Sequence, residues 1–362
     1  VVCDTTRVAP STPQPGSPHV QYREVGNTGL KISEIGFGGG GNAGLMLRGT
    51  HEQQREAIAR AVDLGINYFD QAPDYGDGLS ETNLGRVLKK LRIRPYITTK
   101  VEIREENLND IADHVVCSTE ASLQRMGVDY ADFIQIHNGP RLDKPNITGA
   151  AYNYLWIEDF LRPGGALEGL QRLQKAGKAR FVGFITRGGD GQASRQLIDT
   201  GAFDLINASV HLLNPSAGVK PFGMNMDPDW DGILAYAAAH GVGAAIYSPL
   251  AGGFLNDNAV SGGSPHPLGR GARNEEEGAR INSQIGAFAF LSKKLNPEQP
   301  DDHSLAEAAI RYVLSLEGVT SVLGGFSDVP QVEENTAFSG KGPLSEQNMK
   351  RIEMVWRGNF GV

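Results

Sequence analysis

Residues 50–70 read THEQQREAIARAVDLGINYFD and join a helical pattern directly to a strand pattern. Thr50 is a residue type that caps helices, and Gln53 stands three positions later, as in a capping box. Apolar residues then recur at helical spacing until Gly65 provides a stop signal. The apolar run Ile66–Asp70 follows at once and predicts a buried strand. A helix that leads straight into such a strand is typical of α/β folds.

The same alternation continues through most of the chain. Strands need crossover connections to pair in parallel, so strands that alternate with helices favour a parallel sheet. Eight such units in about 300 residues fit a closed (β/α)8 TIM barrel better than an open sheet. The predicted strands are Glu34–Gly38, Ile66–Asp70, Tyr96–Lys100, Phe133–His137, Phe181–Ile185, Phe203–Asn207, Gly243–Ser248 and Val319–Leu323.

Further patterns complete the expected domain. Strand-like residues on both sides of Asn27-Thr28-Gly29 predict a β-hairpin that would plug the N-terminal end of the barrel. The long connections, residues 138–165, 208–229 and 251–281, all follow strands and so would lie at the C-terminal face, where active sites of this fold form. The composition shows no break, so residues 21–362 are expected to form a single domain behind a flexible tail of residues 1–20.

The composition excludes several classes of protein. The 362 residues are 40% hydrophobic and carry a formal net charge of −8, which fits neither a disordered chain nor a nucleic-acid binder. The sequence has no run of 18 apolar residues and no apolar signal segment. Cys3 and Cys117 make neither a disulfide framework nor a metal-ligand cluster. We expect a cytoplasmic protein with no metal, nucleic-acid or membrane partner, and the sequence leaves a homo-oligomer open.

The glycine-rich stretch Gly36–Gly41 matches the pattern G-x-G-x-x-G directly after a predicted strand. Asp70 at the end of the next strand also fits a Rossmann fold. The next predicted helix, however, begins only near residue 50, too far away to present its N-terminus to a pyrophosphate. We interpret the stretch as a loop where the backbone approaches a ligand, and many of the 46 glycines follow predicted strands in the same way.

Polar side chains stand at the ends of three consecutive predicted strands. Asp70 ends the second strand and is followed five residues later by Tyr75, while Lys100 ends the third and His137 the fourth. Each residue alone has an ordinary explanation, such as a turn residue, a packed aromatic or a solvated charge. Together, on one face of a barrel, the four predict an active site.

These residue types compose a general acid directed at a carbonyl group. A tyrosine hydroxyl has an ordinary pKa of about 10. A neighbouring lysine lowers that pKa, and a carboxylate keeps the lysine charged and oriented. A histidine can orient a carbonyl oxygen toward the hydroxyl. None of these four side chains can donate a hydride, so reduction of a carbonyl needs a cofactor.

The chain resembles the aldo-keto reductases over residues 20–340. The resemblance implies a TIM barrel that holds NAD(P)(H) across its C-terminal face and interconverts a carbonyl and an alcohol. It implies that Tyr75 is the general acid/base, that Lys100 and Asp70 tune it, and that His137 positions the substrate. The matching segments are Tyr22–Gly29, Asn67–Asp70 with Tyr75-Gly76 and Ser80-Glu81, Thr99-Lys100, Asp132–His137 and Gln331–Asn335.

The same resemblance implies a set of cofactor contacts. Tyr247 would stack on the nicotinamide, while Thr186 and Asn207 replace the Ser-Asn pair and the Gln that many relatives direct at the carboxamide. The expected contacts are Gly38, Gly39, Thr186, Asn207, Tyr247, Ser248, Leu250, Gly252, Gly325, Ser327, Asp328, Gln331, Glu334 and Asn335.

The adenosine end departs from NADP-dependent relatives, which carry Lys or Arg there for the 2′-phosphate. No basic residue lies between Gly324 and Asn335. We expect NAD(H) to be used at least as well as NADP(H), with Asp328 as a candidate partner of a ribose hydroxyl. Arg270 or Arg273, from a long loop, is the alternative source of positive charge.

The long loops and the C-terminal segment are expected to wall the substrate pocket. The spacing of two between residues 152, 154 and 156 fits a short strand equally well. The sequence leaves a xenobiotic carbonyl, a sugar and a natural-product ketone open. It also leaves two other functions: a cofactor-holding regulatory or redox-sensing subunit, and a TIM-barrel isomerase or lyase without nicotinamide. The expected wall residues are Tyr152, Tyr154, Trp156, Phe160, Phe222, Met224, Met226, Trp230, Trp356 and Phe360.

Overall fold

The computed structural model describes residues 20–145, 153–219, 226–263, 269, 272 and 274–361. At its centre, eight parallel strands form a closed barrel, as predicted. Each predicted strand overlaps an observed one, and the ends agree to within two residues. In the order of the barrel, the strands are β3 (Ile35–Gly38), β4 (Tyr68–Asp70), β5 (Tyr96–Val101), β6 (Ala131–Ile136), β9 (Ala179–Ile185), β10 (Leu205–Ser209), β11 (Gly243–Tyr247) and β12 (Val319–Gly325).

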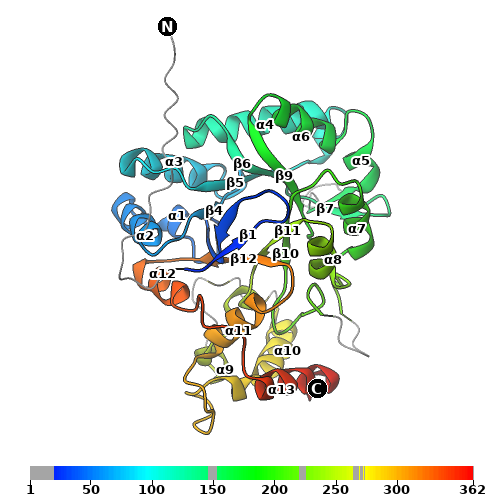
Figure 1. Ribbon diagram of the computed structural model, residues 1–362. Helices are drawn as coiled ribbons and strands as arrows, with labels where there is room; N and C mark the ends of the chain where they lie inside the picture. The colour runs from blue at the N-terminus through cyan, green and yellow to red at the C-terminus, as the bar shows by residue number, and fades with distance from the viewer. Residues whose placement is uncertain are drawn as a thin grey trace.

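Helices surround this barrel (Figure 1). The second helix begins with the predicted capping box between Thr50 and Gln53, and the fourth ends at Gly127, which has a left-handed φ of 66°. The helices are α1 (Leu45–Arg48), α2 (His51–Asp63), α3 (Leu79–Leu91), α4 (Ile111–Met126), α5 (Ile157–Leu161), α6 (Ala166–Lys175), α7 (Gly191–Asp199), α8 (Ile233–Ala239), α9 (Asp257–Val260), α10 (Glu275–Gly286), α11 (Leu305–Leu314), α12 (Val329–Thr336) and α13 (Glu346–Arg357). None of the helices in these described ranges has the length and apolar character that a membrane span requires.

The predicted hairpin closes one end of the barrel. Strands β1 (Tyr22–Glu24) and β2 (Lys31–Ser33) pair antiparallel, and the hairpin lies across the barrel in Figure 1. Its apolar side chains, Val25, Leu30 and Ile32, pack with residues of the barrel interior. The Asn27 amide donates to the Gly241 carbonyl, which precedes β11, at 2.8 Å. The hairpin therefore plugs the N-terminal end and leaves the C-terminal face for the site.

Replacing Gly26 by Ala is expected to lower the free energy of unfolding by about 3 kcal/mol or more. A Cβ on Gly26 would lie 2.0 Å from the Gly241 carbonyl oxygen, so the hairpin would have to move off the barrel. Gly29→Ala is the matched control, because Gly29 also has a positive φ, 71°, but nothing lies within 4 Å of its Cβ position. That variant is expected to lose only about 1–2 kcal/mol. Urea unfolding measures both, and equal losses would contradict tight docking.

Candidate active site

Three of the four predicted catalytic side chains meet at one buried ammonium group. Parallel pairing of β4 with β5 brings their carboxyl ends together, so Asp70 at the end of β4 lies beside Lys100 near the end of β5. The Lys100 Nζ donates to Asp70 Oδ1 at 2.5 Å, to the Gln71 carbonyl at 2.6 Å and to Tyr75 Oη at 3.2 Å. These bonds use all the protons of the ammonium. Lysine is therefore held charged and directed at the tyrosine hydroxyl.

Burial is the largest single influence on the pKa values of Tyr75 and Lys100. It raises the pKa of Tyr75 to about 12; the Lys100 charge opposes this rise, and the Asp70 charge adds to it. From the lysine and the carboxylate that holds it we expected a lowered pKa of Tyr75, but burial raises the pKa instead. For Lys100 itself, burial lowers the pKa, but the charges of Asp70 and Tyr75 outweigh burial and raise it above its ordinary value. Tyr75 is thus a protonated acid and Lys100 a cation throughout the neutral range.

Asp70 is held from its other side as well. The Asn207 Nδ2 of β10 donates to Asp70 Oδ2 at 2.9 Å, and Asn207 Oδ1 accepts from Gln135 Nε2 at 3.0 Å. All three side chains are almost fully buried. The predicted carboxamide contact Asn207 therefore also orients the carboxylate that pairs with Lys100.

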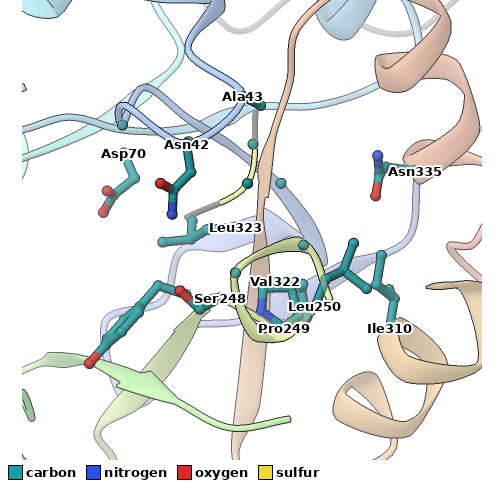
Figure 2. A pocket seen from close by; sticks show the side chains of 18 of the residues that line it. Asn42, Ala43, Asp70, Ser248, Pro249, Leu250, Ile310, Val322, Leu323 and Asn335 are labelled. Carbon is teal, nitrogen blue, oxygen red and sulfur yellow. The ribbon is translucent and has the colours of Figure 1, made fainter. Parts of the chain in front are cut away.

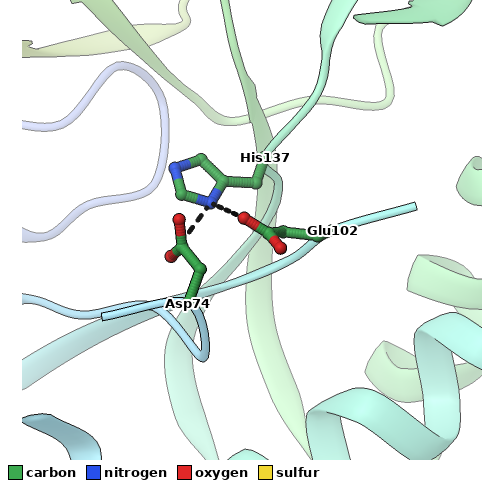
Figure 3. Close-up of side chains that lie close together, drawn as sticks. All are labelled: Asp74, Glu102 and His137. Carbon is green, nitrogen blue, oxygen red and sulfur yellow. Dashed lines mark ion pairs between the residues drawn. The ribbon is translucent and has the colours of Figure 1, made fainter. Parts of the chain in front are cut away.

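His137, directly after β6, lies between two carboxylates and a guanidinium. Its Nδ1 is 3.4 Å from Asp74 Oδ1 and 3.4 Å from Glu102 Oε1 (Figure 3). Its Nε2 is 3.1 Å from Arg187 Nη2. Burial, followed by the charges of Lys100 and Arg187, lowers the pKa of His137 well below its ordinary value, although Asp74 opposes the shift. The ring is therefore neutral, and it packs edge-on against Tyr75 with centroids 6.1 Å apart.

The four predicted catalytic side chains line a cavity of about 440 Å³ at the C-terminal face. In Figure 2, Asn42 and Asp70 lie on one side and Ile310 and Asn335 on the other, with the turn Ser248–Leu250 between them. The cavity thus extends from the catalytic end to α12, where Gln331, Glu334 and Asn335 share one helix face. Of the predicted site residues it is lined by Asp70, Tyr75, Lys100, His137, Gly38, Asn207, Tyr247, Ser248, Leu250, Gly252, Gly325, Gln331, Glu334 and Asn335.

Four predicted cofactor contacts do not line the cavity. Gly39 packs against the Gln71 side chain, where a Cβ would lie 2.3 Å from the amide. The Thr186 hydroxyl is buried and lies 3.4 Å from the Asn207 carbonyl. Asp328 is the N-cap of α12 and accepts from the Gln331 amide and from Ser327 Oγ. Arg270 and Arg273, the alternative source of positive charge, lie outside the described residues.

The described lining residues suit a dinucleotide. Ser248 and Ala251 adopt left-handed φ angles of 56° and 50°, which is strain concentrated in the turn after β11. A Cβ on Gly40 would lie 3.5 Å from the Tyr75 ring, so a larger residue would encroach on the phenol. The amides of Gln331 and Asn335 and the carboxylate of Glu334 line the α12 end, and the described cations of the lining, Lys100 and Arg187, lie at the Tyr75 end.

The predicted aromatic walls are absent from the described lining of this cavity. Phe160, Trp230, Trp356 and Phe360 are buried in the hydrophobic core instead. Residues 154–156 form the short strand that was the alternative, β8 (Tyr154–Trp156), which pairs with β7 (Gly139–Arg141). Met226 is half-buried away from the cavity lining. Tyr152, Phe222 and Met224 lie outside the described residues.

Sequence reasoning missed three residues around His137, namely Asp74, Glu102 and Arg187. Glu102 stands two positions after Lys100, and Arg187 two positions after Ile185, which lines the cavity. Side chains of an extended chain point to the same side at every second position. That period is the signal that would have found Glu102 and Arg187.

Comparisons with known proteins agree with this geometry. The model of the aldo/keto reductase family matches residues 34–357. L-galactose dehydrogenase of Arabidopsis thaliana is 29% identical over 88% of each chain, and a probable voltage-gated potassium channel subunit beta of the same plant is 26% identical over 87% of this chain and 90% of its own. The structure of an aldo-keto reductase from Bacillus halodurans, in its holo form, superposes with a TM-score of 0.68 at 23% identity, over 93% of this chain and 96% of that one. The chain belongs to the aldo/keto reductase family and is an NAD(P)(H)-dependent oxidoreductase.

Proposed function

We propose that this enzyme interconverts an alcohol and a carbonyl with Tyr75 as the proton donor and acceptor. The observation that carries the proposal is the bond of 3.2 Å between Lys100 Nζ and Tyr75 Oη beside a cavity that reaches α12. The bound nicotinamide supplies or accepts the hydride. In reduction, Tyr75 gives its proton to the carbonyl oxygen, and in oxidation it takes the proton of the alcohol. Lys100 and Asp70 hold the hydroxyl in place and limit the charge that accumulates there.

We further propose that NAD(H) binds at least as well as NADP(H). At the α12 end, the described lining offers Gln331, Glu334 and Asn335, which are neutral or anionic. A 2′-phosphate dianion there would face a carboxylate without a compensating described cation, so its binding would be weakened. Because Asp328 caps α12 outside the lining, we assign the ribose end to the residues on this helix face and no longer to Asp328.

Replacing Glu334 by Gln is expected to tighten NADPH binding about three- to tenfold and to change NADH binding less than about twofold. Removal of the Glu334 charge reduces the repulsion of the 2′-phosphate of NADPH. The Gln side chain still offers a polar partner to the ribose hydroxyl of NADH. Glu333→Gln is the matched control, because Glu333 pairs with Arg60 at 2.7 Å and does not line the cavity. Titration of nicotinamide fluorescence measures the six dissociation constants, those of wild type and the two variants for NADH and for NADPH. Wild-type enzyme that binds NADPH tenfold tighter than NADH would refute the cofactor proposal.

For the substrate we propose a sugar, oxidised at its hemiacetal carbon with NAD⁺. The relative named L-galactose dehydrogenase, at 29% identity, supports this class, and a preference for NAD(H) would suit oxidation. The test is a panel of aldoses, simple alcohols, aldehydes and ketones with both cofactors in both directions, followed by nicotinamide absorbance. Turnover of aldoses and NAD⁺ above the other pairs is expected. Cofactor binding without any turnover would favour a regulatory subunit instead, and failure to bind either nucleotide would favour an isomerase or lyase.

Three broader expectations stay part of the proposal. Residues 21–362 are taken as one barrel domain, and the tail expected over residues 1–20 lies, apart from Val20, outside the described residues. The low cysteine content supports a reducing compartment such as the cytoplasm. A homo-oligomer remains compatible with these features, and size-exclusion chromatography with light scattering measures it directly.

A further inference from the structure

Glu102 and His137 lie together because their strands are neighbours in the barrel. The parallel register of β5 with β6 pairs Val101 with Ile136, so the next residues along the chain, Glu102 and His137, leave the two strands side by side. Asp74 comes from the loop after β4, and both carboxylates face the imidazole Nδ1 in Figure 3. The side chains of His137, Glu102 and Asp74 are 4%, 7% and 19% exposed. Two carboxylates are thus directed at one buried ring nitrogen.

The three facing atoms have no hydrogen-bond partner among the described residues. They are Nδ1 of His137, Oδ1 of Asp74 and Oε1 of Glu102. The second oxygen of Glu102, Oε2, accepts from Arg104 Nη2 at 3.1 Å, which leaves Oε1 for the ring. Burial raises the pKa of Asp74, and the nearby Glu102 carboxylate adds to the rise. Buried polar atoms without partners destabilise a fold, and a cation held between them would offset this cost.

The separations between these atoms match the edges of a tetrahedral metal site. Nδ1 lies 3.4 Å from Asp74 Oδ1 and 3.4 Å from Glu102 Oε1, and the three atoms lie within 4.8 Å of one another. Direct N–H···O bonds are shorter, at about 2.7–3.2 Å. Zn²⁺ binds imidazole nitrogen and carboxylate oxygen at about 2.0–2.2 Å, and a tetrahedron with such bonds has edges of about 3.3–3.6 Å. The two carboxylates also balance the charge of a divalent cation.

A second cavity gives an ion access to this group. It has a volume of about 290 Å³, and Asp74 and Glu102 line it together with the exposed Glu106. His137 lines the first cavity, whose described lining includes neither carboxylate. The three atoms therefore lie between the two cavities, and an ion reaches them without crossing the substrate cavity. Water from the second cavity would be the fourth ligand, as at zinc sites with three protein ligands.

We propose that Asp74, Glu102 and His137 bind a zinc ion, with the fourth position open to water from the second cavity. The sequence had led us to expect no metal, because the two carboxylates were not recognised as neighbours of His137. The contact of 3.1 Å between Arg187 Nη2 and His137 Nε2 leaves the position of the ring proton open. Zinc at Nδ1 would place that proton on Nε2, so the histidine keeps a donor for a substrate oxygen. This last role rests on the proposed function, whereas the zinc site itself does not.

Zinc binding is tested on the full chain, purified without a histidine tag and dialysed against a chelator. Competition with a chromophoric zinc chelator should show a site with a dissociation constant of about 1 µM or less. Asp74→Asn and Glu102→Gln preserve side-chain size and remove one charged ligand each. Each should weaken zinc binding by at least about 10- to 100-fold, the loss that follows even from changing a partner of a ligand. Glu106→Gln is the matched control, because Glu106 lines the second cavity outside the group, and should bind zinc within about twofold of wild type.

Two further measurements support the reading of these affinities. Co²⁺ in place of zinc should give the intense visible absorption of a four-coordinate site, and Glu102→Gln should lose it. Melting temperatures and NADH dissociation constants without zinc show whether each variant is folded, and the wild-type Co²⁺ spectrum decides if a variant is not.

Three outcomes would overturn the proposal: wild-type zinc binding weaker than about 100 µM, unchanged affinity in both folded carboxylate variants, or equal weakening in Glu106→Gln. The first would leave a shared proton or water between the carboxylates, and the other two would place zinc elsewhere on the surface. Wild-type enzyme without turnover on any substrate of the panel would refute the proposed function and would not change the zinc affinities. The two failures are therefore distinguishable.

Discussion

Tyr75→Phe is expected to lower kcat about 10³-fold or more while the NADH dissociation constant stays within about twofold of wild type. The substitution removes one oxygen atom that receives a hydrogen bond from Lys100 at 3.2 Å. It keeps the ring that lines the cavity and packs against His137. Proton transfer is lost, and the surface seen by the cofactor is almost unchanged. Stopped-flow turnover and fluorescence titration give the two quantities separately.

A control variant and the pH profile of the wild type test this prediction further. Tyr154→Phe is the matched control, because Tyr154 is half-buried near the same face but does not line the cavity, and its kcat should stay within about twofold. The second readout is the pH profile of the wild type. Because burial raises the pKa of Tyr75 to about 12, the phenolate needed for alcohol oxidation grows about tenfold per pH unit between about pH 6 and pH 9, and reduction stays flat. Oxidation that is independent of pH, or an active Tyr75→Phe, would remove Tyr75 from its assigned role.

The barrel could be predicted because its signals are local. The run Ile66–Asp70 and the run Phe181–Ile185 each predict a strand from apolar residues alone, and the capping box at Thr50 marks a helix start. The strand β7 gave no comparable signal, and the spacing of two at β8 fitted a short strand and a pocket wall equally well, since each strand is only three residues long. Their pairing depends on contacts between segments separated along the chain, so the aromatic residues near them were interpreted as pocket walls.

The grouping of Asp70, Tyr75, Lys100 and His137 could be predicted from residue types at strand ends, but the electrostatics of the group could not. The lysine beside Tyr75 is visible in the sequence, whereas the burial that raises the pKa of Tyr75 depends on the complete fold. For Asp328, in contrast, the local sequence already contained the explanation. An Asp followed three residues later by Gln is a helix-start pattern, and Asp328 does cap α12. Local capping was thus a sufficient explanation for a residue that had been interpreted as a ribose partner.

Lys100→Met is the second large expected effect, and it acts on stability as well as activity. Lys100 and Asp70 are 1% and 3% exposed at their side chains and bond at 2.5 Å. Removal of the cation leaves Asp70 buried with only its Asn207 bond among the described partners, at a cost of about 3–5 kcal/mol in the free energy of unfolding. Lys350 and Glu346 also bond at 2.5 Å, but they are 70% and 81% exposed. Lys350→Met is therefore the matched control and should leave the urea midpoint unchanged.

The double variant Asp70→Asn/Lys100→Met separates the structural from the catalytic role of the pair. With both charges gone, no unpaired ion remains in the interior, so we expect most of the lost stability to return. Activity should stay about 10²- to 10⁴-fold below wild type, because Tyr75 still lacks its ammonium partner. The pKa of Lys100 is raised in the folded state, so its contribution to stability is complete below the unfolded pKa of about 10.4 and falls only as the pH rises through the folded value. The stability difference between wild type and Lys100→Met should therefore be constant from about pH 6 to pH 9. A double variant that regained activity along with stability would show that the ion pair serves the fold alone.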